Sequence, residues 1–474
     1  MTDYISIHLV GSDLPPASFS LEFLPLVEPA APGQPGKSVG EVFIHSANGG
    51  QKILVSLGDP KKLKTDTFRQ AGGAAAKWMI QNQIAAVDLA SDNLDRIEIP
   101  GAVSALIEGL FLGGFQFLSY KTPEEKTSKT PIVQIRTTNP SEYEKILLHA
   151  QTLCEYVNLE RTWGHEPANI INPITLAERV AALAVELGLA CTILDEKELE
   201  KMGAGGIVNV GKGSNTPSRM IILEYPGKPG SDQEKPVVLV GKAITFDTGG
   251  YSLKGVDNIV GMKYDKCGGI TVAATLATAA KLGLRRPIIG IIAASENMIS
   301  GGAYRPDDII RMLSGKTVEI ISTDAEGRLV LADALALAQQ KYSPRAIIDL
   351  ATLTGGVLVA LGRIRAAIMG NNQELIQNLI QSGEATQELL WQLPMDDDYA
   401  KSIKGDDADI KNSGGREGHA ILGGMFLKQF VSDDIPWVHL DIAAVADTPK
   451  DLPYCPKGAT GFGIRLLIHY LENL

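Results

Sequence analysis

The chain has 474 residues, of which 45% are hydrophobic and 21% charged, a composition typical of soluble globular proteins and, at this length, of two or more domains. Its formal net charge is -11 and it has no basic tract, which argues against a general affinity for nucleic acids or anionic membranes. Cationic or free-amine substrates would not be repelled by such a protein.

Cysteine usage and the amino terminus indicate the compartment. The four cysteines form no CxxC pair and lie far apart, which favours neither a thiolate zinc site nor a disulfide framework; they are Cys154, Cys191, Cys267 and Cys455. The segment MTDYISIHLVGSD lacks a basic region followed by a long apolar one, and no run of about 18 apolar residues occurs. We therefore expect a cytoplasmic protein with no membrane partner.

Residues 1–135 predict an amino-terminal α/β domain, because strand-like runs alternate with helical ones. The predicted strands are Ile5–Val10, Val42–His45, Lys52–Ser56 and Ala85–Leu89, and the predicted helices are Thr67–Gln81 and Ala102–Gly113. Proline, glycine and polar residues without an apolar period predict loops at 28–37 and 121–131.

Residues 136–165 predict a connecting helix, and 166–474 predict a larger catalytic domain. The helix begins at Ser141 with Glu144 as a capping box, and apolar residues follow on one stripe. In the larger domain, strand-like runs alternate with helices, which indicates a central, largely parallel mixed sheet covered on both faces. The runs are Val237–Val240, Ile288–Ala294, Val318–Ile321, Ala346–Leu350, Ala366–Met369 and Trp437–Ile442.

Two charged stretches of the larger domain follow apolar runs. After the first run come Lys242, Asp247, Lys254 and Asp265, in a segment rich in glycine. Charged residues rarely line a core unless they are paired or bound to metal. Ligands of largely parallel sheets collect beyond the carboxyl ends of the strands, where these residues would lie.

The second charged stretch is IISTDAEGRL at 320–329. If its backbone is extended, Asp324, Glu326 and Arg328 point to the same side, and two carboxylates and a guanidinium converge beyond a strand end. The plainer interpretation is that acids near the start of a helix only cap it and complement its dipole.

These stretches, VGKAITFDTGGYSLK at 240–254, MKYDKCGG at 262–269 and STDAEGRL at 322–329, resemble the leucine aminopeptidase family of dinuclear metallopeptidases. The resemblance extends over most of the chain, through GLFLGGFQFLSYKT, EPANIINPITLA, ENMISGGAYRPDD, DLATLTGG and WVHLDIAAVA. The chain departs from the family where Ser322 replaces Asn, Ala243 and Asp307 replace Gly, and His165 replaces Asn.

The resemblance implies a ligand set for two metal ions. Asp247 and Glu326 would bridge both ions, Lys242 and Asp265 would complete one, and Asp324 the other. Without cysteine or histidine the set suits Zn or Mn, with Mg or Co also compatible, and two dications would neutralise its four carboxylate charges. Lys242 can ligate only as a neutral amine; the alternative, a lysine paired with Asp247, stays open.

Catalytic roles follow from the same resemblance. A metal-bridging water or hydroxide would attack the scissile carbonyl, and Lys254 would stabilise the developing oxyanion. Arg328 stays protonated and cannot be a base, so it would hold a bicarbonate ion that carries the proton. Met262 would line the pocket for the first side chain, Leu or Met; the alternative is an ordinary core methionine.

The expected protein is therefore a leucyl aminopeptidase that removes amino-terminal residues from peptides and assembles as a homohexamer. A two-metal phosphoesterase usually adds histidines, and the seven histidines here pair with no ligand set, although His165 and His419 sit beside glycines in expected loops. The alternative outside enzymes is a catalytically inactive hexameric scaffold or binding protein of the same family. Gly206–Gly213 departs from a phosphate-binding loop at its last position and predicts a plain glycine loop.

Overall fold

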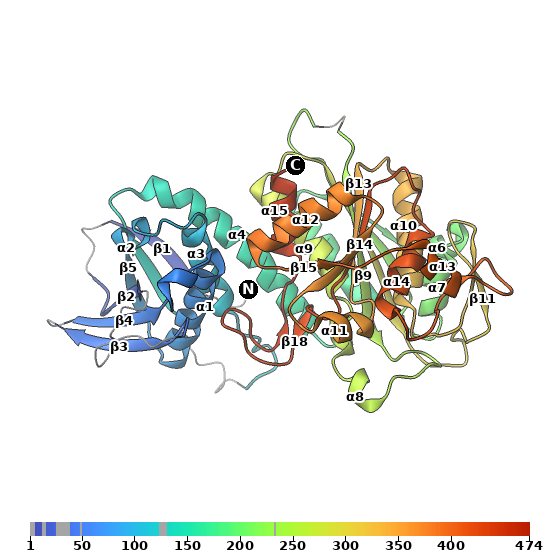
Figure 1. Ribbon diagram of the computed structural model, residues 1–474, viewed down its shortest axis with the longest axis horizontal. Coiled ribbons are helices and arrows are strands. Elements are labelled where there is room, and N and C mark those ends of the chain that lie inside the picture. Colours follow the sequence, from blue (N-terminus) through green and yellow to red (C-terminus); the bar gives the residue numbers. More distant parts are fainter. Residues whose placement is uncertain (1–4, 12–15, 25–37, 48–49, 123–129, 232–233) are drawn as a thin grey trace. The chain divides into compact units, whose positions relative to one another are not determined.

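The structure is a computed structural model of the chain and describes residues 5–11, 16–24, 38–47, 50–122, 130–231 and 234–474 (Figure 1). Its internal contacts divide the chain into a smaller unit, Met1–Asn158 with Pro449–Lys457, and a larger unit, Leu159–Thr448 with Gly458–Leu474. Both units contain a sheet and helices, which confirms the predicted two-domain α/β class. The domain boundaries expected after residues 135 and 165 stay predictions.

The smaller unit is built on a six-stranded sheet in the order β1-β6-β5-β2-β4-β3. Neighbouring strands are parallel except for β4 and β3. The strands are β1 Ser6–Val10, β2 Phe19–Leu24, β3 Val42–Ala47, β4 Gly50–Ser56, β5 Ala86–Ala90 and β6 Ile132–Arg136. The sequence predicted four of them and missed β2 and β6, in which polar residues interrupt short apolar runs.

Helices of the smaller unit agree with the sequence prediction. They are α1 Thr65–Gln81, α2 Ser91–Asp95, α3 Ala102–Gly113 and the 3₁₀ turn η1 Pro60–Lys62, and α4 Pro140–His165 runs on into the larger unit. Helices α1 and α3 cross at glycines: a Cβ added at Gly72 would lie 2.3 Å from the Leu106 oxygen, and one at Gly109 would lie 2.1 Å from the Arg69 oxygen. The loop predicted at 28–37, and most of that at 121–131, lie outside the described residues.

The larger unit is built on an eight-stranded mixed sheet in the order β15-β14-β17-β13-β9-β10-β8-β7. Its centre, from β17 through β13 and β9 to β10, is parallel, as predicted. The strands are β7 Ala190–Leu194, β8 Arg219–Tyr225, β9 Val237–Asp247, β10 Ile288–Asn297, β13 Ala346–Ala351, β14 Ala366–Gly370, β15 Leu390–Gln392 and β17 Trp437–Asp441. Strand β9 is almost wholly buried, which explains its continuous apolar run.

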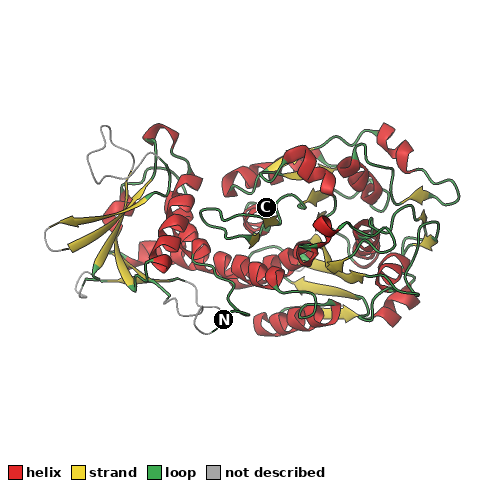
Figure 2. Cartoon of the chain, turned by 90° about the horizontal axis from the view of Figure 1, so that it is seen from below, coloured by secondary structure: helices red, strands yellow, loops and turns green. Residues whose placement is uncertain are grey.

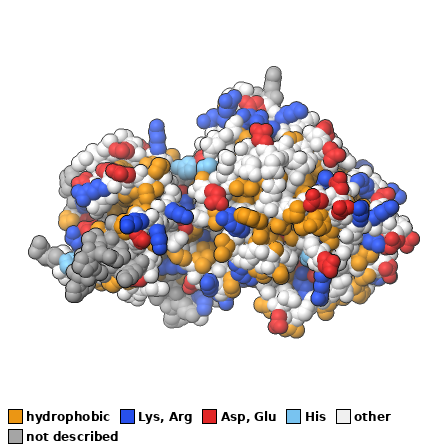
Figure 3. All heavy atoms as spheres, in the orientation of Figure 1, with side chains coloured by type: hydrophobic (Ala, Val, Ile, Leu, Met, Phe, Trp, Pro, Cys, Tyr) orange, Lys and Arg blue, Asp and Glu red, His pale blue; other side chains and the backbone are white. Residues whose placement is uncertain are grey.

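Helices cover both faces of this sheet (Figure 2). They are α5 Pro173–Leu187, α6 Glu196–Met202, α7 Gly205–Gly211, α8 Val256–Ile259, α9 Cys267–Leu282, α10 Gly327–Lys341, α11 Gly355–Leu361, α12 Gln373–Thr386, α13 Asp397–Ala400, α14 His419–Lys428 and α15 Ile464–Glu472, with 3₁₀ turns η3 Met262–Tyr264 and η4 Lys401–Ile403. None of the helices in the described parts of the chain is long and apolar enough to cross a membrane. On the face drawn in Figure 3, acidic and basic side chains are interspersed.

Two predictions for the larger unit were wrong. The run Val318–Ile321 does not enter the central sheet; β12 Thr317–Glu319 pairs with β11 Ile309–Arg311 and β16 Ile410–Lys411 in a separate three-stranded sheet. Gly206–Gly213 is not a plain loop, because most of it forms α7. The Asp333 carboxylate accepts a hydrogen bond from the Ile207 N–H at 3.0 Å, so this helix start already has an anion of the protein itself.

Three departures from the family pattern have clear local surroundings. Ala243 is fully buried, and a Cβ added at Gly269 would lie 2.7 Å from its methyl group, so α9 approaches β9 closely at this point. Asp307 has a φ of 71°, a left-handed conformation that glycine adopts without strain. His165 is buried at the end of α4, where its Nδ1 donates to the Arg161 oxygen at 2.7 Å, and is not in the expected surface loop.

His419 likewise opens α14 and is not in a loop. The remaining small sheet pairs β18 Asp447–Thr448 with β19 Gly458–Ala459.

The glycine crossing of α1 and α3 gives a stability prediction. Gly109→Ala should lower the free energy of unfolding of the smaller unit by about 1–3 kcal/mol, the usual cost of overpacking a close contact. The sign is informative because alanine is otherwise the better helix former. Chemical denaturation followed by circular dichroism measures the change, and Gly50→Ala is the control, since a Cβ there meets no atom within 4 Å.

Candidate functional site

The candidate site lies where neighbouring parallel strands of the larger sheet end. Asp247 is the last residue of β9, Asn297 the last of β10, and Thr352 directly follows β13. Because β9 is parallel to both β10 and β13, their carboxyl ends meet at one edge of the sheet. Asp265 directly follows η3 and lies two residues before the start of α9.

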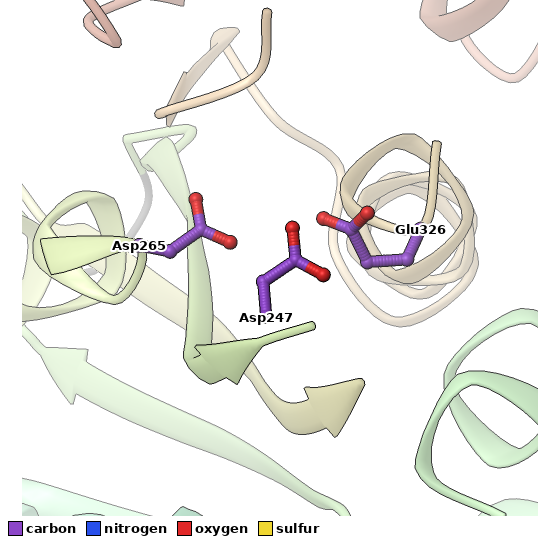
Figure 4. A group of neighbouring side chains, drawn as sticks. All are labelled: Asp247, Asp265 and Glu326. Carbon is purple, nitrogen blue, oxygen red and sulfur yellow. The ribbon is translucent and has the colours of Figure 1, made fainter. Parts of the chain in front are cut away.

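Three carboxylates converge at this edge. Asp247, Asp265 and Glu326 each offer an oxygen, and these oxygens lie within 4.8 Å of one another. Figure 4 shows Asp247 at the end of its strand, between Asp265 on one side and Glu326, at the start of α10, on the other. All three side chains are buried, so their mutual repulsion is weakly screened by water.

Lys242 provides the first compensating charge. Its Nζ lies 2.8 Å from Asp265 Oδ1 and 2.9 Å from Glu326 Oε1, and it donates to the Thr352 oxygen at 2.9 Å. The lysine is therefore paired, although with these carboxylates and not with Asp247. A Cβ added at Gly327 would lie 2.6 Å from Lys242 Cε, so the glycine that opens α10 makes room for this side chain.

Lys254 provides the second compensating charge. Its Nζ lies 2.7 Å from Asp247 Oδ2 and 2.5 Å from Asp324 Oδ1. Asp324 is not a member of the close carboxylate group, and Lys254 links it to that group. The five predicted ligands and Lys254 are thus brought into one continuous network of charged side chains.

The sequence interpretation considered an extended backbone for the second charged stretch, but the structure has a turn there. Residues 322–326 form a turn before α10, in which Ser322 Oγ accepts from the Asp324 N–H at 3.2 Å. The fully buried Asn412 holds the turn: its Oδ1 accepts from the Ile321 N–H at 2.8 Å, and its Nδ2 donates to the Ser322 oxygen at 2.6 Å. The family's usual Asn could make the same short turn as Ser322.

Sequence reasoning missed three residues that position the carboxylates. Asn297 Nδ2 donates to Asp247 Oδ1 at 2.8 Å and to the Thr323 oxygen at 3.0 Å, which ties the end of β9 to the turn. Thr352 Oγ1 donates to Asp265 Oδ1 at 2.7 Å. Asn412 is the third. The motifs ENMIS and DLATLTGG contained the first two, but neutral side chains carry no charge signal in a sequence.

The cluster shifts the pKa values of its members. Burial, with the charge of Glu326, raises the pKa of Asp247 to about 8, and burial raises that of Asp265 to about 6 although Lys242 opposes the shift. Burial lowers the pKa of Lys242, but the charges of Asp265, Glu326 and Asp247 outweigh it and raise that pKa above its usual range. Without a cation Lys242 is therefore an ammonium, and ligating a metal would require it to lose a proton.

Two oxygen atoms show that the cluster suits cations. Asp265 Oδ2 and Glu326 Oε2 are buried and have no hydrogen-bond partner within the described chain. A buried carboxylate oxygen left without a partner is costly, and coordination to a metal ion would satisfy it. The residues present therefore fit the divalent ions that the sequence predicted.

Arg328 and Met262 lie outside the carboxylate group. Arg328 is buried, its Nη1 donates to the Asn412 oxygen at 2.7 Å, and its Nε has no partner among the described residues. Burial lowers the pKa of Arg328 to about 10, so it stays a cation at neutral pH. Met262 is half-buried in η3, three residues before Asp265.

Comparisons with known proteins agree with this fold. Residues 158–468 match the catalytic domain of the cytosol aminopeptidase family, and residues 37–124 match its N-terminal domain. The fold and site thus define the class, a two-domain α/β protein with a charged centre beyond its sheet. The chain belongs to the cytosol aminopeptidase family, a family of peptidases.

Individual relatives cover most of the chain. A probable cytosol aminopeptidase of Geobacter sulfurreducens is 44% identical over 89% of this chain and 84% of its own. The cytosol aminopeptidase of Rickettsia prowazekii is 38% identical over 89% of this chain and 85% of its own. The solved structure of the bottromycin maturation enzyme BotP in complex with Mn matches with a TM-score of 0.87 and 30% identity, covering 96% of this chain and 99% of that one.

The raised pKa of Asp247 predicts a pH effect in metal-free protein. A carboxyl group that binds its proton more tightly when folded contributes a stability that is lost as pH rises from its unfolded pKa, about 4, to its folded value. Wild type should therefore lose stability relative to Asp247→Asn between pH about 4 and 8. Denaturant titrations of both proteins, with a chelator present, measure this difference, and a difference that does not vary with pH would contradict it.

Proposed function

We propose that this chain is a metal-dependent aminopeptidase that releases amino-terminal residues from peptides, with leucine and similar residues preferred. The observation that carries the proposal is the buried group of Asp247, Asp265 and Glu326. Two of its oxygens have no hydrogen-bond partner among the described residues, and two lysines form ion pairs with it. Membership in a peptidase family supports the reaction class.

Two divalent ions per subunit would be held by Lys242, Asp247, Asp265, Asp324 and Glu326. Zn and Mn are the first candidates, with Mg and Co also compatible with oxygen ligands, and the Mn complex of BotP supports manganese. When bound, such ions supply Lewis acidity and lower the pKa of water into the neutral range.

Lys254 would act on the reacting carbonyl. Its ammonium group is fixed by Asp247 and Asp324, and their charges, with that of Glu326, raise its pKa above the usual range despite burial. It therefore stays charged at neutral pH and can donate a proton of the ammonium group to the oxygen on which negative charge develops. Its two carboxylate partners hold it in place before the substrate arrives.

Arg328 would hold an anion that moves the proton. The guanidinium itself stays protonated, and its buried Nε is available as a donor. A bicarbonate ion bound there would be the proton carrier, as the family resemblance implies. Asn412 keeps Arg328 beside the turn that carries Asp324 and Glu326.

Substrate selection would rest on the free α-amine and on the first side chain. Carboxylates and metal ions favour a substrate with an amine at its end, and Met262 would line an apolar pocket for Leu or Met. By the family resemblance we also propose that the protein is cytoplasmic and that it forms a homohexamer. Light scattering measures the number of subunits directly. Nothing in the site favours the inactive scaffold, since all seven functional side chains are present.

Metal removal tests the mechanism. Stripped protein should lose hydrolysis of Leu-amide, and Mn, Zn or Co should restore it, because bound metal ions would supply the acidity that activates water. Steady-state rates and elemental analysis of the same samples measure this. Full activity in protein shown to be free of metal would refute the proposal.

End recognition gives a second test. Leu-amide should be hydrolysed while N-acetyl-Leu-amide is not, because acetylation removes the charge and basicity of the α-amine. Product release followed by chromatography measures both rates under the same conditions. Comparable rates on the two compounds would indicate an endopeptidase or another mode of binding.

A third test separates Lys254 from Arg328. Lys254→Ala should lower kcat by about 10² to 10³ with metal content unchanged, as for loss of one oxyanion donor. Arg328→Ala should lower it by only about 10 to 10², and should weaken any activation by bicarbonate. Kinetics with and without bicarbonate, alongside metal analysis, distinguish the roles. Loss of metal in Lys254→Ala would make Lys254 a ligand, and unchanged bicarbonate activation in Arg328→Ala would place the anion elsewhere.

A further inference from the structure

A cavity of about 650 Å³ lies in the larger unit, next to the carboxylate cluster but separate from it. Its apolar wall includes Phe246, Met298, Ile259 and Val260, and two charged residues, Lys263 and Glu296, also line it. None of the five candidate metal ligands belongs to its lining. The volume lies within the range of about 300–1,000 Å³ that is usual for small-molecule sites.

The strands β9 and β10 separate this cavity from the cluster. A bulge adds one residue to β9 between Ile244 and Asp247, and beyond it Asp247 is paired with Asn297. Asp247 and Asn297 bind each other on the cluster side, whereas their neighbours Phe246 and Glu296 line the cavity. The cluster and the cavity therefore lie on opposite faces of the same two strand ends. A ligand in the cavity would not displace a substrate from the carboxylates.

The charged groups of the cavity keep unused hydrogen-bonding capacity. Lys263 Nζ donates one of its three protons to the His165 oxygen at 2.8 Å, and it also lies 5.2 Å from the centre of the Tyr264 ring. Glu296 Oε2 accepts from Ser214 Oγ at 2.6 Å, which leaves the other oxygen. Within the described chain neither residue forms an ion pair, with the other or with a third group. One cavity thus offers an ammonium, a carboxylate and an apolar wall.

We propose that this cavity is a second binding site for the zwitterion of an apolar α-amino acid. The ligand's ammonium would pair with Glu296, its carboxylate would pair with Lys263, and its side chain would lie against Phe246 and Met298. Leucine is the natural example, because it would be a product of the enzyme; this identification of the ligand's source rests on the proposed function. Binding itself needs only the cavity.

The position of the cavity defines the kinetic consequence. Phe246 adjoins Asp247, and Lys263 adjoins Met262, so a ligand contacts the backbone on either side of the site without occupying it. Bound leucine would therefore change kcat, whereas leucine bound as a product at the carboxylates would compete with substrate. Wild-type protein should therefore show two effects of leucine: a change in kcat from binding in the cavity, and competition with substrate from binding at the carboxylates.

Equilibrium dialysis of the metal-loaded full chain with labelled L-leucine tests the proposal. Met298→Trp would fill the cavity and Val260→Trp would block its exposed side. Each variant should therefore bind one molecule of leucine per chain fewer than wild type. Val185→Trp, at an equally exposed residue outside the cavity, should lose none. Glu296→Gln and Lys263→Met should each weaken this site by about tenfold or more, the usual effect of losing a charged hydrogen bond.

Ligand analogues give an independent measure. N-acetyl-leucine lacks the ammonium and leucinol lacks the carboxylate, so neither should compete for the leucine that Val260→Trp loses. Equal leucine binding in wild type, Met298→Trp and Val260→Trp would overturn the proposal. If the protein hydrolyses no Leu-amide but its cavity variants bind less leucine, the proposed function is refuted and the binding site stands. If the protein is an active enzyme and its cavity variants bind leucine normally, the binding site is refuted and the proposed function stands.

Discussion

The larger unit depends on the compensation of buried negative charge at the carboxyl ends of its parallel strands. Asp247, Asp265 and Glu326 lie too close together to be ionised without nearby cations, because their repulsion is weakly screened inside the protein. Lys242 and Lys254 supply that charge from the same segment of chain. The two lysines are placed differently: Lys242 lies between Asp265 and Glu326, and Lys254 lies between Asp247 and Asp324.

Neutral side chains orient the acidic groups of the cluster. Asn297, Thr352 and Asn412 direct donors at carboxylate or backbone oxygens, so the acidic groups are oriented without adding charge. Gly327 leaves room for the Lys242 side chain at the start of α10. Neutral donors that hold the carboxylates in place are the kind of support that a preorganised metal centre requires.

The ends of β9 and β10 border both the carboxylate cluster and the cavity. On one face their ends carry the cluster, and on the other they form part of the wall of the cavity between Phe246 and Met298. Asp247 and Asn297 belong to the cluster, and their neighbours Phe246 and Glu296 belong to the cavity. A ligand on one face can therefore influence the other through backbone that both share, without any contact between the ligands.

The sequence by itself determined the α/β class, the family and the identity of the charged residues. Runs such as that of β9 and the motifs around Asp247, Asp265 and Glu326 are local, so they can be recognised without knowing the fold. The sequence interpretation placed β12 in the central sheet, which was wrong, and it considered an extended backbone at Asp324, where the structure has a turn. A short apolar run does not reveal which strand it will pair with, and a turn held by Asn412 depends on a residue about 90 positions away.

Only the tertiary structure decided how the charges are paired. The sequence left Lys242 either a metal ligand or a partner of Asp247. In the fold its Nζ lies against Asp265 and Glu326, and its role as a metal ligand stays a proposal. It also assembled the neutral residues that hold the carboxylates, and the cavity behind them. Pairing and cavities depend on distances between segments far apart in the chain, and such distances exist only after the sheet has brought its strand ends together.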